Sequence, residues 1–229
     1  MRIFSFIFAR GGSKGLPKKN VKKLNGKPLI VYSLQISKNI KKIEKCFVST
    51  DSIEISNIAS RYNAHVINRP IKLSSDFSPE WKAWQHAIKY CIKKYGKFDV
   101  FISLPATSPF KKVSDIKKCI KLLDHNTDVV ITMSQSQRNP WFNMVQSKAN
   151  NFLKLVNKKT RRIARRQDAP EVFDISTICY VAKPDFILKN NSFWDGRVKG
   201  LEIPFERSID IDTGFDFKLA NLLLKDKRG

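Results

Sequence analysis

Short, continuous apolar runs alternate with longer amphipathic stretches over most of the chain. The runs predict β-strands at residues 2–9, 45–49, 64–68, 100–104 and 128–133. Between them, apolar residues recur every three or four positions, as Trp81, Trp84, Ile88 and Cys91 do, and this spacing predicts helices. Strands that alternate with helices indicate an α/β protein of the Rossmann-like class, with a mostly parallel sheet covered by helices on both faces.

Polar residues predict where several of these helices begin. A helix is expected at 29–38 after Pro28, and the pair Asp51 and Glu54 resembles a capping box. Ser114 is expected to cap a helix, and Thr213 to cap the last one. One face of that last helix is expected to carry Phe215, Leu219, Leu222 and Leu223. Short strands are expected at 178–182, 201–204 and 208–211.

Residues 135–176 interrupt this rhythm, since they are polar and basic and have no clear period. No internal repeat or linker is visible, so we expect one domain over 1–229 with 135–176 as an inserted arm. The arm carries Trp141, Phe142 and Phe152. Apolar residues on a projecting arm usually need a partner surface, and we therefore expect a homodimer.

The charge is strongly basic: 43 Lys and Arg against 20 Asp and Glu give a net charge of +23 over 229 residues. Such an excess favours anionic partners, either nucleic acid or a nucleotide with an acidic sugar. Abundant Lys, Ile, Asn and Phe are also typical of AT-rich genomes, which would make the excess incidental. The basic residues are dispersed, the aromatic residues follow core periodicity, and no nucleic-acid-binding module is recognisable. We therefore expect no nucleic-acid partner.

Signals for targeting, zinc binding and disulfide bonds are weak. The apolar run at 3–9 is too short for a signal-peptide core, and no stretch approaches the roughly 20 apolar residues of a membrane span. The four cysteines form no C-x-x-C pair. A cytoplasmic protein with no membrane association, zinc site or disulfide framework is expected.

The segment ARGGSKGLPKKN, residues 9–20, directly follows the first predicted strand. Its glycines at 11, 12 and 15 let a ligand approach the backbone, whose N–H groups can bind phosphate oxygens. Arg10, Lys14 and Lys19 add positive charge. The segment matches neither the Walker A pattern nor G-x-G-x-x-G. Phosphate binding is the favoured interpretation, and an ordinary solvated basic loop is the alternative.

Two further segments carry candidate chemistry. In SIDIDTGFDF, Asp210 and Asp212 lie two residues apart, so an extended backbone would turn both carboxylates towards one hard cation. The alternative is a polar turn that caps the last helix. In LPATSP, at the end of a strand, Thr107 and Ser108 either bind a ligand or begin a helix.

In this order, these segments resemble those of the acylneuraminate cytidylyltransferase family, the CMP-sialic acid synthetases and their relatives. The resemblance covers essentially the whole chain and includes STDSIEI from Ser49, Arg69-Pro70, and SSDFS at 74–78. It implies transfer of CMP from CTP to the anomeric hydroxyl of an acidic nine-carbon or related 3-deoxy-ulosonic sugar, with release of pyrophosphate. A nucleotidyltransferase for a different sugar or sugar phosphate is the alternative within enzymes, and a basic nucleic-acid-binding protein is the alternative in another class.

The resemblance also implies roles for individual residues. The nucleotide would be bound by Ala9, Arg10, Gly11, Ser13, Lys14, Lys19, Asn20, Arg69 and Ser78. Arg10 and Lys14 would stabilise charge on the reacting phosphates, and Asp210 and Asp212 would bind Mg²⁺ or Mn²⁺. The sugar would be bound by Thr107, Arg166, Gln167, Tyr180 and Phe193.

Two positions depart from the sialate-specific pattern. Pro105 stands where those members often carry glutamine, and Phe142 stands near the position of a lysine. Both departures fall on the sugar side, so the resemblance implies the reaction class without singling out N-acetylneuraminate as the sugar. Legionaminate, pseudaminate or another 3-deoxy-ulosonate fits equally well.

Overall fold

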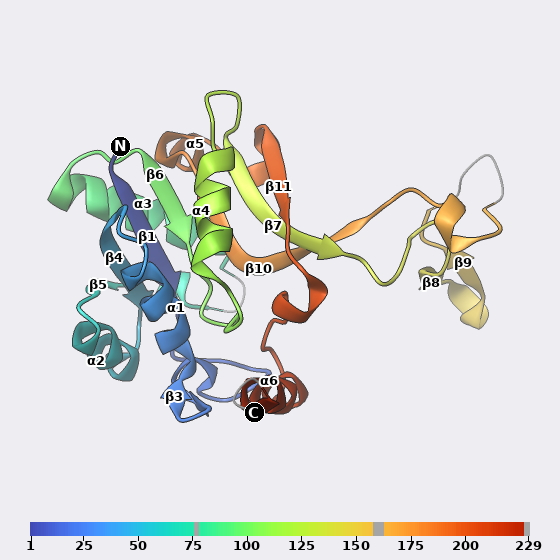
Figure 1. The fold of residues 1–229 in the computed structure, drawn as a ribbon, viewed down its shortest axis with the longest axis horizontal. Coiled ribbons are helices and arrows are strands. Elements are labelled where there is room, and N and C mark those ends of the chain that lie inside the picture. Colours follow the sequence, from blue (N-terminus) through green and yellow to red (C-terminus); the bar gives the residue numbers. More distant parts are fainter. Residues whose placement is uncertain (76–77, 158–162, 227–229) are drawn as a thin grey trace.

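A twisted seven-stranded sheet forms the centre of the protein (Figure 1). The computed structural model describes residues 1–75, 78–157 and 163–226. Along the chain the sheet strands are β1 (Ile3–Phe8), β4 (Ile43–Thr50), β5 (His65–Asn68), β6 (Val100–Ser103), β7 (Val129–Gln135), β10 (Phe173–Ala182) and β11 (Val198–Glu202). They lie in the order β11-β7-β10-β6-β1-β4-β5, and only β10 runs antiparallel to its neighbours.

Helices cover both faces of this sheet. One face packs against α1 (Leu29–Lys38), α2 (Ile53–Arg61) and α4 (Val113–Leu122), and the other against α3 (Glu80–Tyr95) and α5 (Pro184–Lys189). Side chains alternate along β1, so Ile3 and Ile7 enter the first core and Phe4 and Phe6 the second. The expected Rossmann-like fold, with a mostly parallel sheet, is confirmed.

The chain changes direction around β1. From β1 it moves outwards through β4 to β5 and then returns to β6 on the other side of β1. In open α/β sheets, ligands bind beyond the carboxyl ends of the strands at such a reversal. The loops that follow β1 and β6 therefore meet at the place where a ligand site is expected.

A third apolar cluster joins the first loop to the C-terminal helix α6 (Gly214–Asp226). A short hairpin, β2 (Lys23–Leu24) with β3 (Lys27–Pro28), lies beside α6. The inward face of α6 carries Phe217 and Ala220, with Leu223 partly buried. The face predicted from the sequence is wrong: Phe215, Leu219 and Leu222 are exposed. The register of α6 is set by packing against Leu24 and Leu29, which local periodicity does not reveal.

Several predicted boundaries also needed correction. The Oγ of Ser52, not Asp51, caps α2 by accepting a hydrogen bond from the N–H of Ile55 at 3.4 Å. α4 begins at Val113, before Ser114, and the carboxylate of Asp115 accepts from the N–H of Lys112, the residue that precedes the helix, at 2.9 Å. Residues 208–211 form no strand, and β11 begins and ends earlier than 201–204. Thr213 does cap α6, since its Oγ1 accepts from the N–H of Asp216 at 3.2 Å.

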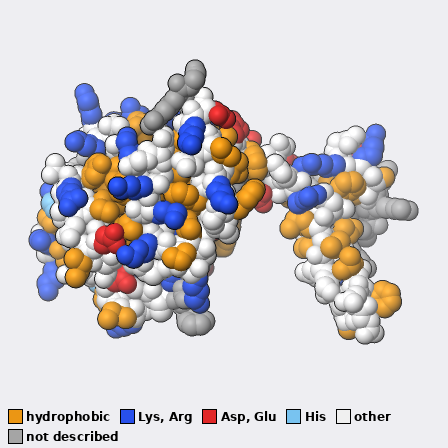
Figure 2. All heavy atoms as spheres, turned by 90° about the horizontal axis from the view of Figure 1, so that it is seen from below, with side chains coloured by type: hydrophobic (Ala, Val, Ile, Leu, Met, Phe, Trp, Pro, Cys, Tyr) orange, Lys and Arg blue, Asp and Glu red, His pale blue; other side chains and the backbone are white. Residues whose placement is uncertain are grey.

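The block at 135–176 projects from the body of the protein, with β7 leading out and β10 returning (Figure 1). Its tip holds an antiparallel hairpin of β8 (Val145–Ser147) and β9 (Leu153–Leu155). Met144, Val145, Phe152 and Leu153 are exposed on it, and Figure 2 shows apolar side chains grouped on the projecting part. Trp141 and Phe142 are half-buried. We name residues 135–176 the arm.

Short 3₁₀ helices complete the described chain, at Lys19–Val21, Ile71–Leu73, Ala149–Asn151, Arg166–Asp168, Phe193–Asp195 and Phe205–Arg207. All four cysteines are free thiols. Among the described helices, none is both long and apolar enough to cross a lipid bilayer. Lys and Arg side chains are scattered over the face in Figure 2 and form no single stripe there.

Candidate functional site

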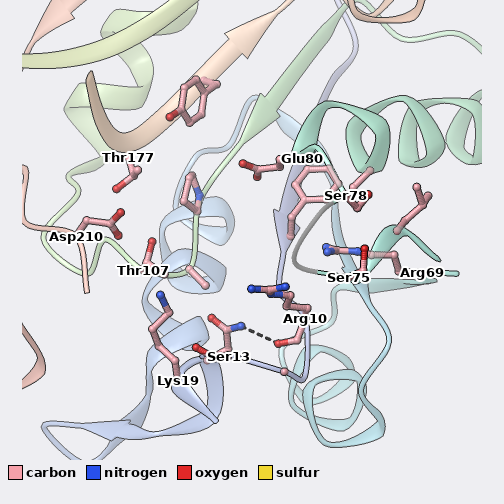
Figure 3. Close-up of a pocket in the computed structure, with 18 residues that line it drawn as sticks. Arg10, Ser13, Lys19, Arg69, Ser75, Ser78, Glu80, Thr107, Thr177 and Asp210 are labelled. Carbon is pink, nitrogen blue, oxygen red and sulfur yellow. Dashed lines mark hydrogen bonds between the residues drawn. The ribbon is translucent and has the colours of Figure 1, made fainter. Parts of the chain in front are cut away.

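A cavity of about 350 Å³ opens at the carboxyl ends of β1 and β6 (Figure 3). Nine of the predicted site residues line it: Arg10, Ser13, Lys19, Asn20, Arg69, Ser78, Thr107, Tyr180 and the expected metal ligand Asp210. They come from five separate segments of the chain. The volume of the cavity falls within the range of small-molecule binding sites.

The loop after β1 is held in shape by its glycines and by Asn20. A Cβ on Gly15 would lie 2.4 Å from the backbone oxygen of Asp212, so only glycine lets these two segments meet. The buried side chain of Asn20 donates to the backbone oxygen of Arg10 at 3.0 Å. The loop is thereby fixed both to itself and to the segment that carries Asp210.

Three predicted nucleotide residues do not line the cavity. Ala9 is buried beneath it, and the N–H of Gly11 donates to the carboxylate of Asp51 at 2.9 Å. Lys14 lies on the exposed part of the loop. Gly12 lines the cavity instead, and a Cβ there would meet nothing within 4 Å.

Arg69 forms the opposite wall together with Ser75 and Ser78 (Figure 3). Its guanidinium donates to the hydroxyl of Ser49 at 3.1 Å and to the backbone oxygen of Ser49 at 2.7 Å, and it lies over the ring of Phe8. Burial lowers the pKa of Arg69 from its ordinary value. These contacts fix the guanidinium against the ends of β1 and β4. Asp76 and Phe77 of the SSDFS segment lie outside the described residues.

The two aspartates of SIDID behave differently. Asp210 lines the cavity, and its Oδ1 is buried without a hydrogen-bond partner in the described part of the chain. Asp212 is exposed and pairs with the Nζ of Lys19 at 2.7 Å. A buried, unpartnered carboxylate oxygen is suited to a hard cation, which takes its other ligands from phosphate and water. Asp210 therefore fits a magnesium ligand, and Asp212 would have to leave Lys19 to become one. No group of three or more His, Cys, Asp or Glu that could hold a metal occurs among the described residues.

The LPATSP segment connects the segment that carries Asp210 to the sheet. The backbone oxygen of Thr107 accepts from the N–H of Ile211 at 2.9 Å, directly beside Asp210. The hydroxyls of Ser108 and Thr177 lie 2.5 Å apart. Thr177 lines the cavity and lies where the pairing of β10 with β7 is irregular, between Ser176 and Tyr180. Thr107, Thr177 and Asp210 thus form one wall, as Figure 3 shows.

The residues predicted to bind the sugar fall into two groups. Thr107 and Tyr180 line the cavity, and burial raises the pKa of Tyr180 to about 12. Phe193 packs beside the Tyr180 ring, with ring centres 6.4 Å apart, and lies in the second core cluster. Arg166 and Gln167 lie on the arm, where they line a separate hollow with Asn139 and Glu171. The structure does not bring this second pair to the cavity of the same chain.

Half of the residues that line the cavity were not named as binding residues from the sequence, although Gly12, Ser75 and Pro105 lie in segments that it singled out. The residues not named are Phe8, Gly12, Leu73, Ser75, Glu80, Ala83, Pro105, Ala106 and Thr177. The carboxylate of Glu80 accepts from the indole N–H of Trp84 at 3.2 Å, and desolvation by the surrounding protein raises its pKa. Its position in the first turn of α3 was the only sequence signal, and it indicates a favourable helix start as readily as a site.

A protein-family comparison decides the classification of this fold and site. The cytidylyltransferase family model matches residues 5–215, which include every segment that lines the cavity. The chain belongs to the cytidylyltransferase family. The family resemblance drawn from the sequence motifs is confirmed, and with it the class of enzyme, a nucleotidyltransferase.

Several relatives match over nearly the whole of this chain. The post-translational flagellin modification protein B of Campylobacter coli is 35% identical, over 98% of this chain and 96% of that protein. The CMP-N,N'-diacetyllegionaminic acid synthase of Campylobacter jejuni is 33% identical over 98% and 96%, and that of Legionella pneumophila 30% identical over 98% and 97%. The N-acylneuraminate cytidylyltransferase of Streptococcus agalactiae is 28% identical, over 95% of this chain and 52% of that protein.

Solved structures share the fold at low sequence identity. A CMP:2-keto-3-deoxy-manno-octonic acid synthetase complexed with CTP superposes with a TM-score of 0.74 at 14% identity, over 99% of this chain and all of that one. The 4-diphosphocytidyl-2C-methyl-D-erythritol synthase of Anaerococcus prevotii gives 0.65 at 16% identity, over 98% and 99% of the two chains. At these identities, the likeness establishes the fold.

The close approach of Gly15 to Asp212 yields a stability test. We expect Gly15→Ala to lower the free energy of unfolding by about 1–3 kcal/mol, because the backbone of one segment must move. Urea denaturation measures the change. Gly12→Ala is the matched control in the same loop, and we expect it to stay within about 0.5 kcal/mol of wild type. Equal effects of the two substitutions would contradict the tight contact.

Proposed function

We propose that this enzyme transfers CMP from CTP to the anomeric hydroxyl of an acidic nine-carbon sugar of the legionaminic acid type and releases pyrophosphate. The observation that carries the proposal is the cavity, where Arg10, Lys19 and Arg69 face Asp210 in a chain of this family. Full-length similarity to two CMP-N,N'-diacetyllegionaminic acid synthases supports the sugar class. Pro105 in the cavity wall agrees with an acceptor other than N-acetylneuraminate.

In this proposal the triphosphate lies over the loop after β1. Arg10 and Lys19 supply positive charge, Lys14 approaches from the exposed part of the loop, and Ser13 and Asn20 add polar groups. Ala9 and Gly11 contribute through the backbone shape of the loop. The cytidine lies towards Arg69 and Ser78, whose wall is rigid because Arg69 is bonded to Ser49.

Asp210 is the proposed primary ligand of Mg²⁺ or Mn²⁺, with Asp212 as the second. When bound, the metal supplies positive charge that stabilises the phosphoryl oxygens. Lys19 can interact with either group, because its ammonium forms an ion pair with Asp212 and its side chain lines the cavity where the triphosphate is proposed to lie. A triphosphate would compete with Asp212 for this ammonium group and so release the carboxylate.

The chemistry is an in-line displacement at the α-phosphorus. The sugar hydroxyl forms a new P–O bond and loses its proton, and the bond to the bridging oxygen breaks to release pyrophosphate. Such reactions depend mainly on positioning and on charge stabilisation, and they require no covalent intermediate with the enzyme. Arg10 and Lys14 are the proposed side chains that stabilise the charge of the leaving group.

The acidic sugar lies towards Thr107, Tyr180 and Phe193 in this proposal. Arg166 and Gln167 are on the arm, away from the cavity of their own chain, and therefore act on the sugar only if the arm of a second copy closes the site. We accordingly propose a homodimer in which the single domain, 1–229, uses 135–176 as its pairing arm. We further propose that the enzyme works in the cytoplasm, without nucleic acid or a membrane as partner.

The function is tested by pyrophosphate release from each of the four nucleoside triphosphates with a panel of acidic sugars. The panel contains legionaminic, pseudaminic, N-acetylneuraminic and 3-deoxy-octulosonic acids. We expect CTP to be used at least about 100-fold better than the other triphosphates, and a legionaminic-type sugar to give the highest kcat/KM. Activity with a sugar phosphate alone, or with no acidic sugar, would overturn the proposal.

The metal assignment predicts a large effect at Asp210. We expect Asp210→Ala to lower kcat by about 100-fold or more at saturating Mg²⁺, because charge stabilisation at the phosphates is lost. Asp185→Ala is the matched control. Asp185 lies on α5, which follows the end of β10 that points away from the cavity. We expect this substitution to change kcat less than about twofold. A folded Asp210→Ala enzyme with wild-type kcat would remove Asp210 from the metal site.

The arm predicts the oligomeric state. We expect light scattering to show a dimer at micromolar concentration and Phe152→Ser to shift it towards monomer, because Phe152 is 70% exposed on the arm. Phe215→Ser is the control, since Phe215 is 74% exposed but lies on α6. A wild-type monomer, or equal dissociation by both substitutions, would contradict pairing through the arm.

A further inference from the structure

Lys111 is a buried cation immediately beneath the LPATSP segment. Its exposed fraction is 4%, against the usual solvated position of lysine side chains. Its Nζ donates to the backbone oxygen of Pro105 at 2.7 Å, to that of Ser108 at 2.6 Å, and to the hydroxyl of Ser33 at 2.9 Å. Three acceptors match the three N–H groups of one ammonium group.

The hydrogen bonds from Lys111 fix the backbone conformation of residues 105–108. Two backbone oxygens from the segment turn inwards towards one charge, and Ser33 on α1 braces the same point by donating to the Pro105 oxygen at 2.8 Å. Hydrogen bonds from a charged donor are stronger than neutral ones. An apolar side chain at 111 would remove the charged donor from both oxygens and leave the Pro105 oxygen with the Ser33 hydroxyl.

The outer side of the same segment forms the cavity wall. Pro105 and Thr107 line the cavity, and the Thr107 oxygen accepts from the N–H of Ile211, the residue after Asp210. Ser108 is bonded through its hydroxyl to Thr177, which also lines the cavity. The buried ammonium group of Lys111 is therefore bonded to the segment that contacts both Thr177 and the residue after Asp210.

We infer that Lys111 is a positioning residue for CMP transfer: its ammonium group fixes the backbone at 105–108, and that backbone fixes Thr107 and, through Ile211, Asp210. The inference rests on the proposed function of this site. Lys111 touches neither the cavity nor the proposed substrates, so it acts through other residues.

The cost of burying this charge supports the role. Burial lowers the pKa of Lys111 to about 7, while the nearby Cys179 and Asp210 raise it in part. A methionine would fill similar space without that cost. Packing alone does not account for a lysine here, because burying its ammonium group costs desolvation free energy. The same group is suited to holding the two backbone oxygens in a fixed arrangement.

The test combines steady-state kinetics with hydrogen exchange. We expect Lys111→Met to lower kcat by about 10–100-fold, since small misplacements near the reacting groups have effects of that size. The KM for CTP should change less than about threefold, because Arg10 and Arg69 are held by other contacts. Amide exchange at Ile211 should accelerate, while exchange at Phe6 in β1 should not.

Two further variants make the result decisive. Lys118→Met changes an exposed lysine on α4, and it should leave kcat and Ile211 exchange at wild-type values. Ser33→Ala keeps the ammonium group of Lys111 and removes one of its acceptors, so we expect it to lower kcat severalfold. If Lys111→Met does not fold, Ser33→Ala tests the positioning role of Lys111 in its place.

The possible outcomes separate the two proposals. Wild-type protein that transfers no CMP would overturn the proposed function and, with it, the role of Lys111 in that reaction. Active wild type with unchanged kcat and unchanged Ile211 exchange in Lys111→Met, or in Ser33→Ala if that variant must decide, would overturn only the inference. A loss confined to the KM for CTP would also overturn it, because a positioning role for Asp210 must be visible in kcat.

Discussion

The burial of β1 on both faces is the constraint on which the rest of the structure depends. Ile3 and Ile7 enter one core and Phe4 and Phe6 the other, so β1 can lie only in the middle of the sheet, with helices on both sides. Parallel strands on either side then bring their carboxyl ends to one edge. The glycine-rich loop that follows β1 is placed at the centre of that edge, next to the loop after β6.

The cavity at this edge combines charged loop residues with a rigid frame. Its cations and Asp210 come from loops, which by themselves would lose considerable entropy on becoming ordered. The frame reduces that loss through backbone contacts: Gly15 against Asp212, Asn20 on Arg10, and Ile211 on Thr107. Preorganised charge of this kind is what phosphoryl transfer requires, since little covalent chemistry is left to the protein.

The segment that carries Asp210 is anchored from two sides. Ahead of it, Arg207 forms an ion pair with the buried Asp115 at the start of α4, and behind it α6 packs into the third apolar cluster. Lys111 precedes the same end of α4 and holds the neighbouring loop. The N-terminal end of α4 therefore holds two segments that line the cavity, although no residue of that helix lines it.

The sequence by itself determined the fold class, the positions of most strands and the family, because buried strands and amphipathic helices leave local periodic patterns and the nucleotide loop is a contiguous motif. It also indicated nine residues of the cavity. Only the tertiary structure decided which face of α6 is buried, that Asp212 pairs with Lys19 while Asp210 faces the cavity, and that Lys111 is buried beneath Pro105. These outcomes depend on contacts between segments up to 193 residues apart, for which the local pattern around each residue carries no signal.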